Sequence, residues 1–199
     1  MSAFRRYLTR EEERLLFGAV ARIASPLARR DHGWMRLMRY TGIRVGAASQ
    51  LTCRHAREAL KSEYLELEPA IQKRKQGHRV FITRPARRAL QDLLKVRREM
   101  GYIEADAAPL IMSRNHCGMS IRSFQARMRQ WCREAGLDAS ATPHWLRHTL
   151  AKRMMKQSTA MDPRGVVKSA LGHRSIASTS IYTEPDKEDV EQAMQEANC

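Results

Sequence analysis

The chain has 199 residues, with 36 lysines and arginines against 21 aspartates and glutamates, and so carries a net charge of +15. This length forms one domain with a sizeable core, or two small domains at most. The positive charge favours a nucleic-acid partner, since counterion release drives such binding. The alternatives are a solvated basic surface and a surface that binds membranes.

Several classes of protein are disfavoured. No apolar run approaches the roughly 18 residues that span a bilayer, and residues 1–10 lack the apolar core of a signal peptide. We therefore expect a cytoplasmic protein that does not engage the membrane. The four cysteines are scattered without a CxxC pair, which argues against a disulfide framework or a zinc site. We expect no metal and no cofactor.

The N-terminal third is predicted to be helical. Residues 9–12 form a capping box, and apolar residues continue at helical spacing until Ser25-Pro26 breaks the helix. A second helix covers roughly residues 30–40 and ends at Thr41-Gly42. A short helical stretch then begins at Arg44 and runs toward Leu51.

A small sheet follows. Residues 64–67 and 79–83 are predicted strands, and the polar turn 72–77 between them makes an antiparallel hairpin with a basic tip. A helix is predicted over residues 85–100, and residues 101–119 form a connection with one short strand. Another helix covers residues 120–135 and ends at Gly136.

The last third is again predicted to be helical. Thr142-Pro143 begins a helix over residues 144–156, and a short helix over 163–171 stops at Gly172. Ser175 caps a further helix, and an acidic helix covers 184–196. The predicted fold is therefore mainly α with a small antiparallel β-sheet, an α+β class.

The chemistry-bearing residues lie in this last third. His144 and Arg147 are three residues apart, so they share a helix face near the positive end of the helix dipole, where an anion is favoured. His173 and Tyr182 add a proton-handling group and a hydroxyl nucleophile. Each of these signals alone usually has a structural explanation. A lone tyrosine is normally a packed core or surface residue, a histidine and an arginine three residues apart normally lie on a solvated helix face, and a lone arginine such as Arg44 normally caps a helix or pairs with a carboxylate. Together in a basic chain they point to chemistry on a nucleic-acid backbone.

Three boxes in order resemble the tyrosine recombinase (phage integrase) family. Thr41-Gly42-Ile43-Arg44 resembles the first-arginine box, and His144-Trp145-Leu146-Arg147-His148 resembles the HxLRH box. Residues 170–176 with Ser180-Ile181-Tyr182-Thr183 resemble the histidine and nucleophile box. The likeness covers nearly the whole chain and implies a tyrosine recombinase catalytic-domain fold similar to the short fimbrial switch invertases.

The resemblance implies a role for each matched residue. Arg44 and Arg147 would stabilise the charge on the phosphate, and Tyr182 would attack it to form a 3′-phosphotyrosine. His144 and His173 would contact the phosphate or assist proton transfer. No metal or ATP is then needed.

A hairpin lysine would protonate the leaving 5′-oxygen in this family. Lys75 is the better match, and Lys73 is the runner-up because hairpin length varies. We expect Lys73, Arg74, Arg79 and Arg174 to contact DNA. His148 is expected to orient or pack rather than to react.

Two departures from the family pattern stand out. Ala47 occupies the position, three residues after Arg44, where many members carry an acidic residue, so that partner is either missing or supplied from elsewhere. The first box also begins too early for an N-terminal clamp domain. We therefore expect a single catalytic domain over 1–199, with a core over 1–183, which is either a naturally short family member or a catalytic fragment of a longer protein. The tail, 184–199, either exchanges between protomers or folds on its own domain.

The leading hypothesis is a site-specific recombinase that cleaves and rejoins double-stranded DNA. Its expected partners are three further copies in a homotetramer on DNA and accessory DNA-bending proteins, in the nucleoid-associated cytoplasm of a bacterial or phage system. The alternatives are a DNA-binding regulator or accessory protein without strand transfer, and a relaxing topoisomerase.

Overall fold

The computed structural model describes residues 7–71, 77–138, 140–172 and 194–195. The chain divides into two compact units, residues 1–150 and 151–199, and helix α7 crosses the boundary between them. Among the described residues, no helix is both long and apolar enough to cross a bilayer. In chain order, the elements are α1 (Arg10–Ala21), α2 (Pro26–Thr41), α3 (Val45–Ala48), α4 (Cys53–Ser62), β1 (Tyr64–Leu67), the 3₁₀ turn η1 (Pro69–Ile71), β2 (His78–Phe81), α5 (Arg84–Glu99), α6 (Ile121–Glu134), α7 (Pro143–Gln157) and α8 (Pro163–Leu171).

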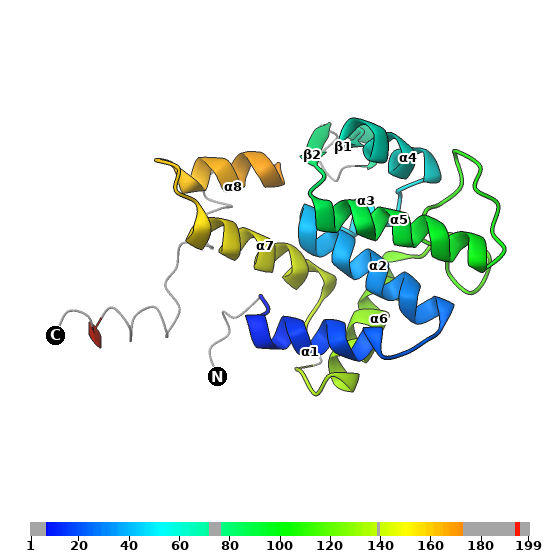
Figure 1. The fold of residues 1–199 in the computed structure, drawn as a ribbon, viewed down its shortest axis with the longest axis horizontal. Coiled ribbons are helices and arrows are strands. Elements are labelled where there is room, and N and C mark those ends of the chain that lie inside the picture. Colours follow the sequence, from blue (N-terminus) through cyan, green and yellow to red (C-terminus); the bar gives the residue numbers. More distant parts are fainter. Residues whose placement is uncertain (1–6, 72–76, 139, 173–193, 196–199) are drawn as a thin grey trace. The chain divides into compact units, whose positions relative to one another are not determined.

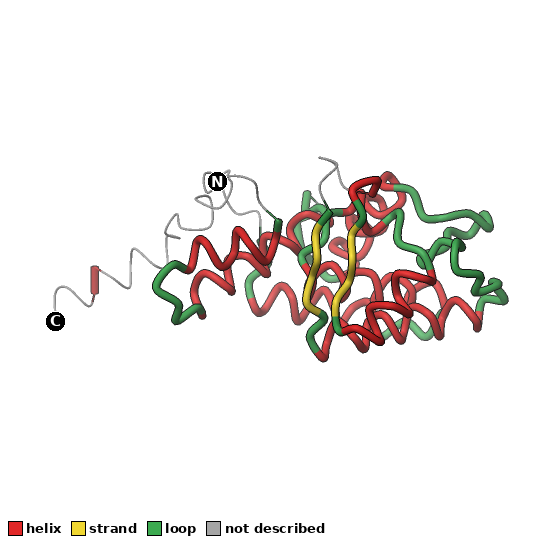
Figure 2. The backbone as a smooth tube through the Cα atoms, turned by 90° about the horizontal axis from the view of Figure 1, so that it is seen from above, coloured by secondary structure: helices red, strands yellow, loops and turns green. Residues whose placement is uncertain are grey.

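The predicted fold class, mainly helical with a small antiparallel sheet, is confirmed. Strands β1 and β2 run side by side as an antiparallel pair (Figure 2), with Tyr64 opposite Phe81 and Leu67 opposite His78. Burial alternates along β1, where Leu65 and Leu67 are buried, while Glu66 between them is exposed. One face of the hairpin therefore packs on the core, and the other meets solvent.

Helix α2 is the centre of the 1–150 unit. Trp34, Met35, Leu37 and Met38 are all fully buried, and α2 lies alongside α5 (Figure 1). A Cβ added at Gly33 would come within 2.9 Å of the Leu93 side chain. The glycine therefore allows α5 to approach the backbone of α2 closely.

Helix α2 begins earlier than the predicted residue 30. The Ser25 hydroxyl accepts a hydrogen bond from the Ala28 amide at 3.1 Å, and Pro26 occupies the first turn. The Ser25-Pro26 pair thus opens α2 and does not end α1, which stops earlier, at Ala21. The C-terminal end agrees with the prediction, because Gly42 caps α2 in the left-handed conformation with φ of 65°.

Helix α4 was missing from the sequence prediction. Its N-cap Thr52 accepts from the His55 amide, while the His55 Nδ1 accepts from the Thr52 amide at 3.1 Å. This is a capping box in which histidine replaces the usual Glu or Gln, so the pattern is easily overlooked. The predicted strand within 101–119 is also absent among the described elements, where Met112 and Gly118 form only an isolated bridge.

A buried carboxylate ties α2 to α6. Asp31 has no exposed surface, and its Oδ1 accepts from Arg30 at 2.7 and 3.0 Å and from the Trp34 indole at 3.0 Å. Its Oδ2 accepts from Arg127 at 2.5 Å and from the Trp131 indole at 2.9 Å. Both oxygens are thus satisfied by donors, which a buried charge requires.

In the 151–199 unit, α8 has the bounds that the sequence predicts. Asp162 caps its N-terminus by accepting from the Gly165 amide at 2.9 Å, and Gly172 ends it with φ of 62°. The helix predicted after Ser175 lies outside the described residues. Of the predicted helix 184–196, only Met194 and Gln195 are described, and they are helical.

Candidate catalytic site

Arg44 lies at the junction between α2 and α3. The left-handed turn at Gly42 ends α2, and the next residue, Ile43, is buried in the core. Arg44 follows in extended conformation as the N-cap of α3 and is half-buried. The turn and the buried isoleucine therefore fix the backbone that carries the first predicted catalytic arginine.

Arg147 is joined to this same turn. The residue is only 3% exposed, and its Nη1 donates a hydrogen bond to the carbonyl oxygen of Gly42. Because Gly42 lies two positions before Arg44, this bond brings the two arginine boxes together, although they are far apart in the sequence. A charged donor bonded to a buried carbonyl is among the stronger single hydrogen bonds in a fold.

The first turns of α7 are held in place by two further contacts. The Leu8 amide donates to the Thr149 hydroxyl at 2.9 Å, and that hydroxyl donates to the Trp145 carbonyl at 2.8 Å. Leu146 packs in the core without exposed surface. These contacts fix the rotation of the helix that carries Arg147, and the chain's N-terminal segment takes part in them.

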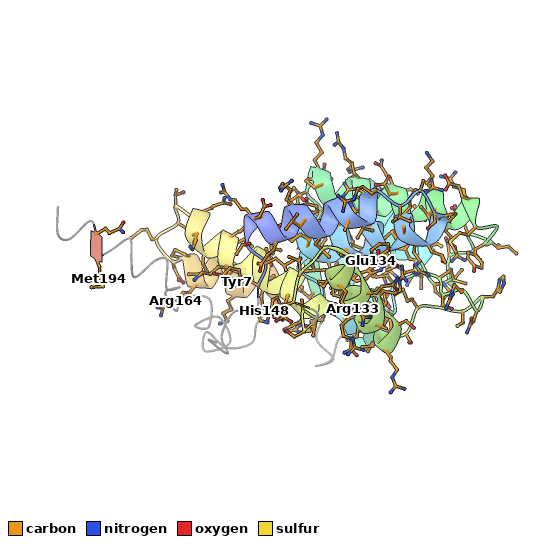
Figure 3. The ribbon with its side chains drawn as sticks, turned by 90° about the horizontal axis from the view of Figure 1, so that it is seen from below. Tyr7, Arg133, Glu134, His148, Arg164 and Met194 are labelled. Atoms are coloured by element: carbon orange, nitrogen blue, oxygen red, sulfur yellow. The ribbon has the colours of Figure 1, made fainter. Side chains whose placement is uncertain are left out.

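The two histidines of the HxLRH box touch one another. His144 is exposed and His148 half-buried, and their rings meet edge to face with centroids 4.4 Å apart. Figure 3 shows His148 on α7. His144 therefore presents an accessible imidazole one turn before Arg147, and the His148 ring packs against it.

Ala47 lies in the hydrophobic core and is only 2% exposed. The position at which many family members carry an acidic residue is therefore filled here by a buried methyl group.

The hairpin is described only at its base. Arg79 on β2 is exposed, forms an ion pair with Glu66 at 2.8 Å and lies over the Tyr64 ring at 4.0 Å. Such exposed pairs contribute little stability, so Arg79 can exchange Glu66 for another anion. The tip with Lys73, Arg74 and Lys75 lies outside the described residues, as do His173, Arg174 and Tyr182.

Two residues that hold the site were not predicted from the sequence. The Gly42 carbonyl and the Thr149 hydroxyl both bind partners distant in the chain. The sequence marks Gly42 as a helix terminator and as part of the first-arginine box, but it does not indicate that the Gly42 carbonyl binds Arg147, and no local pattern marks Thr149.

Comparisons with known proteins place the chain in a family. A model of the phage integrase family matches residues 6–189. The tyrosine recombinase XerC of Neisseria meningitidis is 30% identical over 173 residues, which cover 87% of this chain and 53% of XerC. The XerC of Shewanella amazonensis is 34% identical over 160 residues, covering 80% and 50%. The chain thus spans about half the length of these curated relatives.

Solved structures share the fold. The XerA recombinase superimposes with a TM-score of 0.77 at 22% identity, over 100% of this chain and 66% of XerA. The XerH site-specific recombinase bound to a palindromic difH substrate gives a TM-score of 0.71 at 20% identity, over 96% of this chain and 53% of XerH. With the family model matching nearly the whole length, the chain belongs to the phage integrase family.

Proposed function

We propose that this chain is the catalytic domain of a site-specific tyrosine recombinase that cleaves and rejoins double-stranded DNA. The bond from Arg147 to the Gly42 carbonyl is the observation that carries the proposal, because it unites the two arginine segments. Family membership and the net charge of +15 support it independently.

In the proposed reaction, the phenolic oxygen of Tyr182 attacks the scissile phosphorus. A bond forms between that oxygen and phosphorus, the bond to the 5′-oxygen breaks, and a 3′-phosphotyrosine remains. Arg44 and Arg147 stabilise the negative charge on the non-bridging oxygens. Rejoining reverses these steps, with a 5′-hydroxyl as the nucleophile.

Proton transfer is assigned to the hairpin and the histidines. Lys75, or Lys73 in the alternative register, donates a proton to the leaving 5′-oxygen. His144 and His173 bind the phosphate or assist the transfer. The accessible ring of His144, one turn before Arg147, supports this assignment for His144.

The assembly is also part of the proposal. Two duplexes exchange strands in pairs, so four copies of the chain act together on DNA. Lys73, Arg74, Arg79 and Arg174 contact the backbone, and DNA-bending proteins assist. The reaction takes place in the nucleoid of a bacterial cell, and the tail over 184–199 contacts a neighbouring protomer.

A second function has one observation in its favour. With Ala47 buried in the core, an acidic partner for the active-site cations is absent at this position. A DNA-binding regulator on the same scaffold would tolerate this loss, because binding alone does not require it.

A covalent-trapping assay separates these functions. Nicked duplex substrates drawn from neighbouring genomic DNA are incubated with the wild type and with Tyr182→Phe in the absence of metal. A slow-migrating adduct on a denaturing gel, seen with the wild type only, is the expected result. Salt-sensitive binding without an adduct on the cognate site would instead favour the regulator. Relaxation of plasmids without site preference would indicate a topoisomerase.

A further inference from the structure

A concave site lies at the N-terminal end of α2. A cavity of about 460 Å³ is bounded by the first turn of α2, by the loop before α6 and by one face of α6. Ligand sites in proteins commonly measure about 300–1,000 Å³, so a small molecule fits here.

The cavity is distinct from the arginine pair of the candidate catalytic site. Arg30 lines it from the beginning of α2, whereas Arg44 follows the end of that helix. With a rise of 1.5 Å per residue, Arg30 and Thr41 are about 16 Å apart along the axis. A ligand in the cavity would therefore not touch the turn at Gly42.

The wall of the cavity carries excess positive charge. Arg30, Arg114 and Arg127 line it, and the buried carboxylate of Asp31 neutralises one of the three. Arg114 is exposed and has no ion-pair partner among the residues that the structure describes. Two net positive charges thus remain around one small volume.

One of these guanidinium groups is held in a fixed orientation. Arg127 donates hydrogen bonds from Nε to Asp31 and from Nη1 to the Gln130 side chain. Its Cζ atom also lies over the Trp131 ring, 4.9 Å from the ring centroid. Within the described residues its Nη2 has no further hydrogen-bond partner. A preorganised guanidinium of this kind suits a phosphate, because it loses little freedom on binding.

The other residues that line the cavity are either polar or apolar. Ser113, Asn115 and Ser123 bring polar groups to the rim. Leu27, Met119 and Ala126 provide apolar surface. This combination fits a ligand with an anionic group and a less polar body.

We propose that the cavity binds a small organic phosphate, with the phosphate on Arg114 and Arg127 and the body against Leu27, Met119 and Ala126. This site is independent of the proposed cleavage activity. Binding needs no covalent step, and it supplies the chain with a ligand site separate from its DNA-cleaving centre.

Calorimetric titration at near-physiological salt tests the proposal, with adenosine monophosphate, adenosine and inorganic phosphate as probes. Saturable binding of the nucleotide is expected to be at least about tenfold tighter than that of either fragment. Equal binding of nucleotide and inorganic phosphate would overturn the assignment of the apolar wall. No saturable binding of the nucleotide would overturn the site.

Two variants of the cavity have matched controls. Ala126→Leu adds bulk to the cavity without changing charge, and Gln125→Leu places the same leucine side chain at an exposed neighbouring position that does not line the cavity. Arg114→Ala removes one charge, as does Arg133→Ala at the end of α6 (Figure 3). We expect the cavity variants to weaken nucleotide binding by about tenfold or more and the controls to leave it unchanged.

The same four variants are titrated with duplex DNA. Unchanged duplex affinity for Ala126→Leu, with nucleotide binding lost, supports a dedicated small-molecule site. Loss of duplex affinity with no change toward the nucleotide would show that the phosphate recognised here belongs to the DNA backbone, and would overturn the proposal. Equal losses in cavity variants and controls would mean a general charge effect and would overturn it too.

Discussion

Arg147 donates a hydrogen bond to the carbonyl oxygen of Gly42, and this single contact spans two boxes separated by most of the 1–150 unit. The arginine is almost fully buried, so its charge is held by the protein rather than by water. A guanidinium has five donors. One of them binds the Gly42 carbonyl and thereby fixes the turn before Arg44.

Substitution of Arg147 should affect both stability and catalysis. Arg147→Ala leaves the buried Gly42 carbonyl without this donor and should destabilise the fold by about 1–3 kcal/mol. Cleavage should fall by orders of magnitude, because a guanidinium on the transition-state charge contributes several kcal/mol. Urea unfolding and the covalent-trapping assay measure the two effects.

Arg147→Lys is the informative companion. It retains the charge but not the planar fork, so stability should recover in part while cleavage remains low. Cleavage at the wild-type rate by either variant would remove Arg147 from the catalytic assignment.

The register of the hairpin has its own test. If Lys75 protonates the leaving oxygen, Lys75→Ala should cleave an ordinary substrate slowly and a substrate with a 5′-thio leaving group at a near-normal rate. A thiolate leaves without a general acid, which is the reason for the rescue. Lys73→Ala should show no selective rescue. The opposite pattern would assign the proton to Lys73.

Local signals in the sequence predicted much of the fold. The glycine caps at Gly42 and Gly172 and the Thr142-Pro143 start each depend on neighbouring residues, and the ends of α2, α8 and the start of α7 agree with them. The capping box at Thr52 was missed because His55 takes the place of the usual acidic or amide residue.

Long-range contacts could not be predicted in this way. Asp31 binds side chains on α6, and Arg147 binds the end of α2, and neither pairing leaves a periodic trace in the sequence. The resemblance to a family added Arg44 to the candidate Arg147, but it did not indicate which backbone group would bind Arg147. The alanine at position 47 predicts an acidic partner that is either missing or supplied from elsewhere, and only the packing shows that Ala47 is buried in the core.

The pH dependence of stability should depend on His55. Burial is the main effect that lowers its pKa, with nearby Arg54 acting in the same direction and Glu68 and Glu58 opposing it. Because the folded state resists protonation, the unfolded chain binds more protons as the pH falls below 6.5. His55 thus contributes to the stability of the folded state above pH 6.5, and this contribution is lost as the pH falls below that value.

The variant His55→Gln tests this expectation. Glutamine at this position can still complete the capping box but does not titrate. Urea unfolding between neutral and mildly acidic pH should show a smaller loss of stability for the variant than for the wild type. Burial also lowers the pKa of His32, so the variant should keep part of the pH dependence of stability. Identical pH profiles for the two proteins would contradict the role of His55.

The cysteines should differ in reactivity. Burial is the main cause that raises the pKa of the Cys132 thiol to about 11, with Asp138 and Glu12 adding to the shift. Cys117 is exposed. Since the thiolate is the reactive form, iodoacetamide near pH 9 should label Cys117 in the native protein and Cys132 only after unfolding. Peptide mapping by mass spectrometry measures each site, and rapid native labelling of Cys132 would contradict the expected protection.

The carboxylate that ties α2 to α6 should be far more important to stability than an exposed one. Asp31→Asn leaves the buried Arg30 and the partly buried Arg127 without their shared anion, so we expect a loss of about 3–5 kcal/mol. Asp92→Asn is the matched control, since Asp92 pairs with Arg36 at 2.8 Å but is half exposed; that pair should contribute at most about 1 kcal/mol. Urea midpoints of the two variants measure the difference. Equal losses would mean that the α2–α6 contact depends on apolar packing, such as the edge-to-face pair of Trp34 and Phe124, rather than on the carboxylate.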